Sequence, residues 1–334
     1  MCFSFSKFQA MGVANQDAVR QLALLMEGVD EPLKQTFENM HQGYRDEAIV
    51  RFLKARDGNV AKAHKMLLDC LNWRIDNEVD NILRKPIYSS VFRSIRNCQL
   101  IGLSGYSREG LPIFAVGLGL STRKKMHISH YTHSHIQLNE YRDRVVLPSA
   151  TIRFGRYIGT CIKVLDMTGL NLSTLNQIKL LTLLSTIDDL NYPEKTDIYY
   201  IVNVPYIFLA CWKVVKPLLK ERTRKKIQVL HGSGKDELLQ IMDYESLPHF
   251  CKEQSSGSSK YFPLSLIGST EDCFSADHPF HQGLYDYVEH QQSLFWKSRV
   301  PIKEESFQDD IPEPDPDSTE IALTTESELQ KNGE

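Results

Sequence analysis

The chain lacks the features that mark secreted, disulfide-framework and membrane-spanning proteins. Its seven cysteines are odd in number and scattered without a CxxC spacing, which favours reduced thiols over a disulfide or zinc framework. The first ten residues contain one lysine and no apolar h-region, so we expect no secretory signal. The longest nearly apolar run, the 15 residues Ile198–Trp212, is interrupted by Asn203 and Pro205 and is too short to span a bilayer. These absences predict a cytoplasmic protein.

Catalytic and nucleotide-binding motifs are equally scarce. There is no GxSxG or HExxH motif. The Gly-Lys pair at the end of the turn Gly232–Lys235 matches part of the phosphate-binding motif GxxxxGK[ST]. However, Val229 stands in place of the first glycine, and Asp236 stands in place of the serine or threonine. Because an aspartate there would repel phosphate, we predict only a turn between a strand and a helix.

Histidines and carboxylates occur in clusters, but without the partner residues that a metal site or a catalytic site requires. Four histidines crowd one nine-residue stretch, but no cysteine and no helical i,i+4 pair completes a metal site, which favours a solvated loop. Three aspartates have no histidine or serine at a recognisable spacing, so we interpret them as caps or solvated charges. These residues are His127, His130, His133 and His135, and Asp166, Asp188 and Asp189. We therefore expect no enzyme, no metal site and no cofactor.

Charge is distributed unevenly along the chain. Residues 301–334 hold eleven acidic and two basic residues, a net charge of −9, and we predict that this proline-containing tail is disordered. Since the whole chain carries −3, the remaining 300 residues carry about +6. Mild basicity suits an anionic surface or ligand and is too weak to indicate nucleic acid.

Helical patterns dominate the first part of the chain. After a flexible start at 1–14, residues 15–82 have apolar side chains at helical spacing behind four capping residues, Asn15, Asp30, Asp46 and Asn59. The pattern predicts a compact, all-helical N-terminal module.

Strand and helix patterns alternate after that module. Strands are predicted at 99–106, 111–117, 160–166, 197–204 and 226–230, and helices at 134–147, 174–190, from 206 onward and at 235–242. Such alternation indicates an α/β domain over 90–255 with a mixed, largely parallel sheet flanked by helices. Residues 256–300 form an extension with no clear pattern.

The stretch from 206 to 226 combines an apolar face with a basic one. Phe208 and Trp212 recur at helical spacing, and Lys213, Lys216 and Lys220 form a second stripe. An interfacial helix needs this combination, because its apolar face enters the acyl boundary while its lysines meet anionic headgroups. An ordinary amphipathic helix packed on a sheet fits equally well. Pro217 must end the helix, so any interfacial helix is short.

Five ordered blocks of sequence resemble the CRAL-TRIO lipid-binding family, and in particular its phosphatidylinositol/phosphatidylcholine transfer proteins. They are VRFLKARDGNVAKA (50–63) with WR (73–74), VLDMTGL (164–170), LNYPEKTDIYYIVNVP (190–205), KPLLKERTRKKIQVLHG (216–232) and ELL…LP (237–248). The resemblance implies a helical module followed by an α/β domain. It also implies an apolar lipid pocket between the sheet and a movable gate helix, here about 205–216.

The resemblance also implies a headgroup site and a function. Matching the family's motifs residue by residue places the phosphoinositide headgroup at Arg56, Glu194, Thr223 and Lys226. Phe208, Trp212, Lys213, Lys216 and Lys220 are then the gate and membrane-docking residues. The implied function is non-covalent binding and transfer of phosphatidylinositol or a phosphoinositide by a cytoplasmic protein that associates reversibly with anionic membranes.

Three departures from the family's pattern bear on ligand choice. Asp57 stands where the family has a lysine, and the glycine pair expected after the LPxxF segment is replaced by Cys251 and Lys252. Cys161 and Lys163 replace the hydroxyl pair that holds phosphocholine, which argues against phosphatidylcholine exchange. Two alternatives remain open. The chain is either a sensor that presents phosphoinositide to a lipid kinase, or a binder of another apolar ligand such as a sterol, retinoid or tocopherol.

Overall fold

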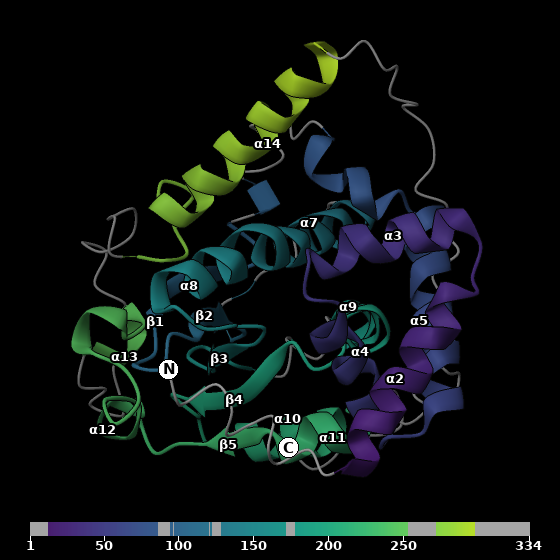
Figure 1. Ribbon diagram of the computed structural model, residues 1–334. Coiled ribbons are helices and arrows are strands. Elements are labelled where there is room, and N and C mark those ends of the chain that lie inside the picture. Colours follow the sequence, from purple (N-terminus) through teal and green to yellow (C-terminus); the bar gives the residue numbers. More distant parts are fainter. Residues whose placement is uncertain are drawn as a thin grey trace.

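The structure is a computed structural model in which residues 13–85, 94–95, 97–119, 121, 128–171, 178–252 and 272–297 are described. Most of the predicted flexible start, and the whole of the predicted acidic tail 301–334, lie outside these residues. Figure 1 shows a group of helices at one end of the molecule and a sheet with its covering helices beside it.

The first group contains four helices and a short 3₁₀ helix. They are α2 (Val13–Glu27), α3 (Glu31–His41), α4 (Arg45–Lys54), α5 (Val60–Asp76) and η1 (Val79–Arg84). Asn59 caps α5 by accepting a hydrogen bond from the Lys62 amide at 2.9 Å, as its position before the apolar periodicity predicts. Leu22, Phe52 and Leu67 are fully buried in one core between these helices, which confirms the predicted helical module.

Five strands form one mixed sheet in the order β1-β2-β3-β4-β5. β1 (Ile101–Tyr106) is antiparallel to β2 (Pro112–Gly117), whereas β2, β3 (Cys161–Asp166), β4 (Thr196–Val202) and β5 (Ile227–Val229) are parallel to one another. The predicted α/β class with a largely parallel sheet is therefore confirmed. Each strand lies within a few residues of its predicted position.

Alternate strand residues face two different layers of helix. Ile113 and Val164 pack against the segment that contains α12 (Lys235–Leu238), η5 (Tyr244–Ser246) and α13 (His249–Lys252). Phe114 and Cys161 face the opposite layer, built from α7 (Ile128–Tyr141) and α9 (Ile178–Asn191). α10 (Phe208–Val215) covers the same face at the carboxyl end of β3 and β4.

The helix predicted at 134–147 is part of a longer, irregular element. α7 runs on without a break into η2 (Arg142–Val146), a π-helical turn, and then into α8 (Leu147–Phe154). Such turns often occur at functional sites. Here it carries three consecutive charged residues, Arg142, Asp143 and Arg144, on the side where the helical module meets the sheet domain.

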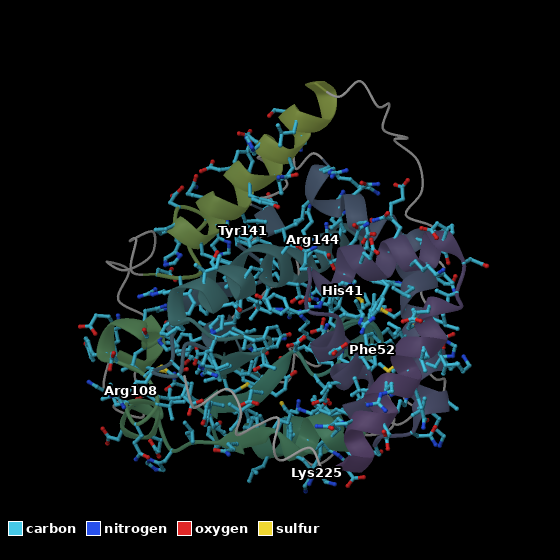
Figure 2. The ribbon with its side chains drawn as sticks, viewed as in Figure 1. His41, Phe52, Arg108, Tyr141, Arg144 and Lys225 are labelled. Atoms are coloured by element: carbon cyan, nitrogen blue, oxygen red, sulfur yellow. The ribbon has the colours of Figure 1, made fainter. Side chains whose placement is uncertain are left out.

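The extension without a sequence pattern contains a long helix, α14 (Pro279–Lys297). Its Phe280 packs edge-on against Phe114 and beside Tyr141, with ring centroids 5.8 Å apart in both pairs; Figure 2 shows Tyr141 next to this helix. The segment before it crosses β1 so closely that a Cβ on Gly102 would lie 1.8 Å from the Cys273 carbonyl oxygen. The described part of the extension, 272–297, thus contributes to the domain core.

No helix within the described ranges is long and apolar enough to cross a membrane. The helix predicted at 235–242 is shorter than expected, since α12 ends at Leu238. The remaining short elements, η4 (Lys216–Leu218) and α11 (Glu221–Lys225), follow α10 and lead into β5.

Candidate functional site: a basic pocket between the two modules

The four residues predicted to bind a headgroup line one pocket. It has a volume of about 80 Å³ and lies where the loop after α4 faces the end of α9 and the start of β4. Arg56 comes from that loop, Glu194 from the turn before β4, and Thr223 and Lys226 from α11 and the residue after it. Segments more than 160 residues apart in the chain therefore meet at a single site.

Glu194 fixes the two basic side chains on one wall. Its carboxylate accepts hydrogen bonds from Lys226 Nζ at 2.7 Å and from Arg222 Nη1 at 3.1 Å. Lys226 also donates to the Thr196 carbonyl at 2.7 Å. Glu194 has a left-handed backbone, with φ of 59°, which is uncommon for a residue with a side chain. The structure thus shows this predicted headgroup residue holding Lys226 in place.

Among the basic residues of the pocket, Arg56 is the one least engaged by other groups of the protein. It is half-buried, and its guanidinium donates to its neighbour's carbonyl, Ala55 O, at 2.9 Å. It forms no ion pair with any carboxylate in the described part of the chain. Asp57, the departure from the family's lysine, contacts Arg222 instead. Most of the Arg56 donors are thus available to a ligand.

Asp189 organises the other wall. The Thr223 hydroxyl donates to it at 3.4 Å, and Lys220 Nζ lies 3.6 Å from its second oxygen. Burial raises the pKa of the Asp189 carboxyl, although Lys220 opposes that shift. Lys220 therefore belongs to the pocket as well as to the predicted lysine stripe.

The floor of the pocket holds a buried guanidinium that the sequence did not single out. Arg142 is 3% exposed, donates to Asp143 at 2.7 Å and to Asn139 at 2.9 Å, and lies 5.7 Å from the Tyr192 ring. Its Nη2 atom is buried and finds no hydrogen-bond partner among the described residues. With Arg142 and Lys195, the pocket lining contains six basic residues and three acidic ones. This excess of cationic donors suits an anionic group such as a phosphate.

Asp188 lies partly buried in an ion-pair cluster, which corrects its interpretation as a cap or a solvated charge. Its carboxylate contacts His135 Nε2 and Asn139 Nδ2 at 2.7 Å each and Lys163 Nζ at 3.4 Å. Burial alone would raise the pKa of Asp188, but His135 and Lys163 outweigh it and hold that pKa well below its usual range. A partly buried lysine, Lys163, thus stands where the family carries part of its hydroxyl pair.

The histidine-rich stretch is helical where it is described, which corrects the prediction of a solvated loop. His130, His133 and His135 lie on α7, while His127 lies outside the described residues. Burial lowers the pKa of His133 to about 4. Within the described residues, no group of three or more histidine, cysteine, aspartate or glutamate side chains could hold a metal ion.

The predicted gate residues divide into inward and outward sets. Phe208 is buried and stacks on half-buried Trp212, with ring centroids 5.7 Å apart, and both pack on the sheet. Lys213 and Lys216 are exposed. Because α10 ends at Val215, the three lysines do not lie on one continuous helix: Lys213 is on α10, Lys216 is on η4, and Lys220 directly precedes α11. The apolar side chains that face solvent here are Tyr206 (96% exposed) and Leu209 (69% exposed). Both lie within the predicted gate segment 205–216, but neither is among the predicted gate and membrane-docking residues.

Comparison with family models confirms the resemblance noted in the sequence. Residues 96–252 match the CRAL/TRIO domain, and residues 15–69 match the CRAL/TRIO N-terminal domain. The four headgroup candidates are divided between the two matched regions, with Arg56 in the N-terminal one.

Similar proteins come from plants and fungi. The chain is 29% identical over 240 residues to phosphatidylinositol/phosphatidylcholine transfer protein SFH12 of Arabidopsis thaliana, a match covering 70% of this chain and 42% of that protein. It is 27% identical over 219 residues to the SEC14 cytosolic factor of Eremothecium gossypii, covering 61% of this chain and 67% of that protein. The plant match thus spans less than half of the relative's length.

A solved structure shares the fold. The crystal structure of Sfh5 superposes with a TM-score of 0.56 at 18% sequence identity, covering 84% of this chain and 98% of the other. The arrangement of helical module and sheet domain described above is therefore that of a known fold.

Proposed function

The chain belongs to the CRAL/TRIO family of non-enzymatic lipid-binding and lipid-transfer proteins, and on that premise we propose that it binds phosphatidylinositol or a phosphoinositide and carries it between membranes. One observation carries the proposal: Arg56, Glu194, Thr223 and Lys226 line a single pocket that is rich in basic groups. No covalent step is involved.

Each pocket residue has a distinct task in headgroup binding. Arg56 offers a planar guanidinium that can bind two phosphate oxygens at once, while Lys226 supplies a point charge. Glu194 orients Lys226 and accepts from inositol hydroxyls with its remaining lone pairs. Thr223 contributes a hydroxyl whose partner, Asp189, is 3.4 Å away, a long hydrogen bond that a ligand can replace.

A closed apolar pocket is needed because a lipid does not leave a bilayer readily. Two acyl chains of about 16 carbons lose roughly 25 kcal/mol of burial on desorption, at about 0.8 kcal/mol per CH₂ group. In this proposal, α10 moves away from the sheet at a membrane, and Phe208 and Trp212 exchange their packing against the sheet for contact with acyl chains.

Exposed residues around α10 suit an anionic membrane surface. Tyr206 and Leu209 present apolar area, and Lys213 and Lys216 are free to meet headgroups. Among the relatives, one is named a cytosolic factor. We therefore propose a cytoplasmic protein that docks reversibly on anionic membranes, either transferring its lipid or presenting it to a lipid kinase.

The test is to identify the bound lipid and its dependence on Lys226. The full chain is incubated with mixed vesicles containing phosphatidylinositol, phosphatidylcholine, a sterol and tocopherol, re-isolated, and analysed by lipid mass spectrometry. We expect phosphatidylinositol in the unmodified protein and at least tenfold less in Lys226→Gln. The adjacent, exposed Lys225 (Figure 2) gives the matched control Lys225→Gln, which should load normally. Loading of sterol or tocopherol in place of phosphatidylinositol would contradict the proposal.

A further inference from the structure

A second, smaller pocket lies at the junction between the helical module and the sheet domain. Its volume is about 30 Å³, and its walls come from the end of α3 and the loop after it, from α4, and from η2, α8 and the loop after α8. Lys195 lines both this pocket and the headgroup pocket. His41, at the end of α3, marks the N-terminal wall (Figure 2).

Arg51 on α4 faces this pocket with few partners. It is 9% exposed, and its one hydrogen bond within the described residues runs from Nη1 to the Pro193 carbonyl at 3.5 Å. Its Nε atom is buried and has no hydrogen-bond partner in the described part of the chain. A buried guanidinium normally has its donors satisfied, since an unpaired buried charge is costly. This side chain therefore points to an unfilled acceptor position in the pocket.

The surrounding charge has the sign that an anion requires. Arg51, Arg142 and Lys195 are all buried, and the carboxylate among them is Asp143. Both Asp143 oxygens are already engaged, one by Arg142 Nε at 2.7 Å and the other by Lys195 Nζ at 3.0 Å. Asp143 thus forms no ion pair with Arg51, although the nearby Arg51 guanidinium contributes to the low pKa of the Asp143 carboxyl.

Tyr157 adds a neutral donor on the same wall. Its ring lies 4.7 Å from that of Tyr44, and burial raises the pKa of its hydroxyl, which therefore stays protonated. The Tyr157 hydroxyl lies close to the backbone of Gly159, where any side chain would clash: a Cβ there would lie 2.3 Å from the Tyr157 oxygen. The negative charge of Glu47 also raises the pKa of Tyr157, but Glu47 does not line the pocket.

We propose that this second pocket binds a small oxyanion with the size and charge of inorganic phosphate, held by Arg51, Lys195 and Tyr157. The bound anion connects α4 of the helical module to the turn before β4 of the sheet domain. It is separate from the headgroup site, because the volume of this pocket is less than half that of the pocket lined by Arg56. A phosphate group is common to a lipid headgroup and to free phosphate, so the experiment uses both sources.

The test is a phosphate titration of the full chain at constant ionic strength, followed by the midpoint of thermal unfolding. A ligand that binds only the folded state raises this midpoint in a saturable way. We expect a saturable rise in the unmodified chain and in Arg56→Ala, in which the headgroup pocket is impaired. In Arg51→Met the apparent affinity should fall at least tenfold, because a charge-assisted donor is lost. The same rise in Arg51→Met, or none in the unmodified chain, would overturn the proposal.

Two further arms keep the result interpretable. Soluble glycerophosphoinositol should produce no Arg51-dependent rise in Arg56→Ala; if it does, the pocket admits a lipid headgroup and the proposed small-anion site is wrong. If Arg51→Met does not fold, crystals of the unmodified chain soaked in selenate provide the measurement. An anomalous selenium peak within hydrogen-bond distance of Arg51 and Lys195 supports the site, and its absence there refutes it.

Discussion

Glu194 illustrates what a matched motif predicts and what it leaves out. The resemblance placed this glutamate in the site together with Arg56, Thr223 and Lys226, and all four do line one pocket. It did not indicate that Arg222 would share the carboxylate, or that Arg142 would form the floor. Arg142 comes from a π-helical turn whose inward direction depends on tertiary packing, so no local pattern marks it.

Lys195 provides a prediction about pH at the residue scale. Burial, together with nearby Arg51, lowers the pKa of Lys195 to about 7, although Asp143 opposes the shift. Between about pH 7 and pH 10 the unfolded chain therefore binds a proton at this lysine that the folded chain does not, and stability rises with pH. Relative to Lys195→Met, the free energy of unfolding of the unmodified protein should increase by on the order of 3 kcal/mol across that range.

The measurement is denaturant unfolding at several pH values. Lys225→Met is the matched control, because Lys225 is exposed and pairs with Glu221 at the surface. Parallel pH profiles for the unmodified protein and Lys195→Met would show that Lys195 keeps an ordinary pKa in the folded state.

Lys163 leads to a prediction about lipid choice. Its ammonium lies 3.4 Å from Asp188 and 5.7 Å from the centre of the Tyr199 ring, at a strand position where the family carries a hydroxyl of its phosphocholine site. A quaternary ammonium placed there would meet a like charge, which costs several kcal/mol. We expect transfer of phosphatidylcholine between vesicles to be at least tenfold slower than transfer of phosphatidylinositol. Equal rates for the two fluorescent lipids would show that other residues replace the missing pair.

At the scale of elements, the patterns with a strong period were the predictable ones. The strand at 160–166 and the helix capped by Asn59 were correctly predicted, because a buried strand requires a run of apolar residues and a helix start favours a capping residue, and both are visible in the sequence. α14 was missed: its buried Phe280, Leu284 and Val288 lie among polar and aromatic residues that mask the helical period. The histidines of α7 were misread because their partners, such as Asp188, are distant in sequence.

The surface around α10 gives a prediction about membrane docking. Lys213 and Lys216 are exposed, and Lys220 is exposed but forms an ion pair with Asp189. Each lysine near an anionic surface contributes about 1 kcal/mol, screened over a Debye length. Changing all three to glutamine should weaken sedimentation with anionic liposomes strongly at low salt and little at high salt.

The apolar residues next to these lysines provide the matched comparison. Leu209→Ser should weaken binding to neutral and anionic liposomes alike, since it removes apolar area and no charge. If the triple glutamine variant binds anionic liposomes normally at low salt, the docking surface lies elsewhere.

At the scale of the whole molecule, a buried ionic network joins the two modules. Arg74 of α5 binds both oxygens of Glu140 on α7, at 2.8 and 3.0 Å, and also contacts Asp80 of η1. Arg144 (Figure 2) contacts the same two carboxylates. Because removing one partner of such a network leaves a buried charge uncompensated, the helical module is held firmly against the sheet domain. This places Arg56 across from Glu194, a geometry that the sequence could not predict without the long-range contacts.

The proposed headgroup binding depends most directly on Arg56, so the decisive measurement is phosphatidylinositol transfer between vesicles by Arg56→Ala. Lys54→Ala is the matched control: Lys54 is an exposed cation two residues earlier, outside the pocket lining. Both variants should keep the unfolding midpoint of the unmodified protein. We predict a loss of at least tenfold in the transfer rate for Arg56→Ala, about 1.4 kcal/mol of headgroup binding, and a change of less than about twofold for Lys54→Ala. Equal transfer by the two folded variants would contradict the assignment of this pocket to the headgroup.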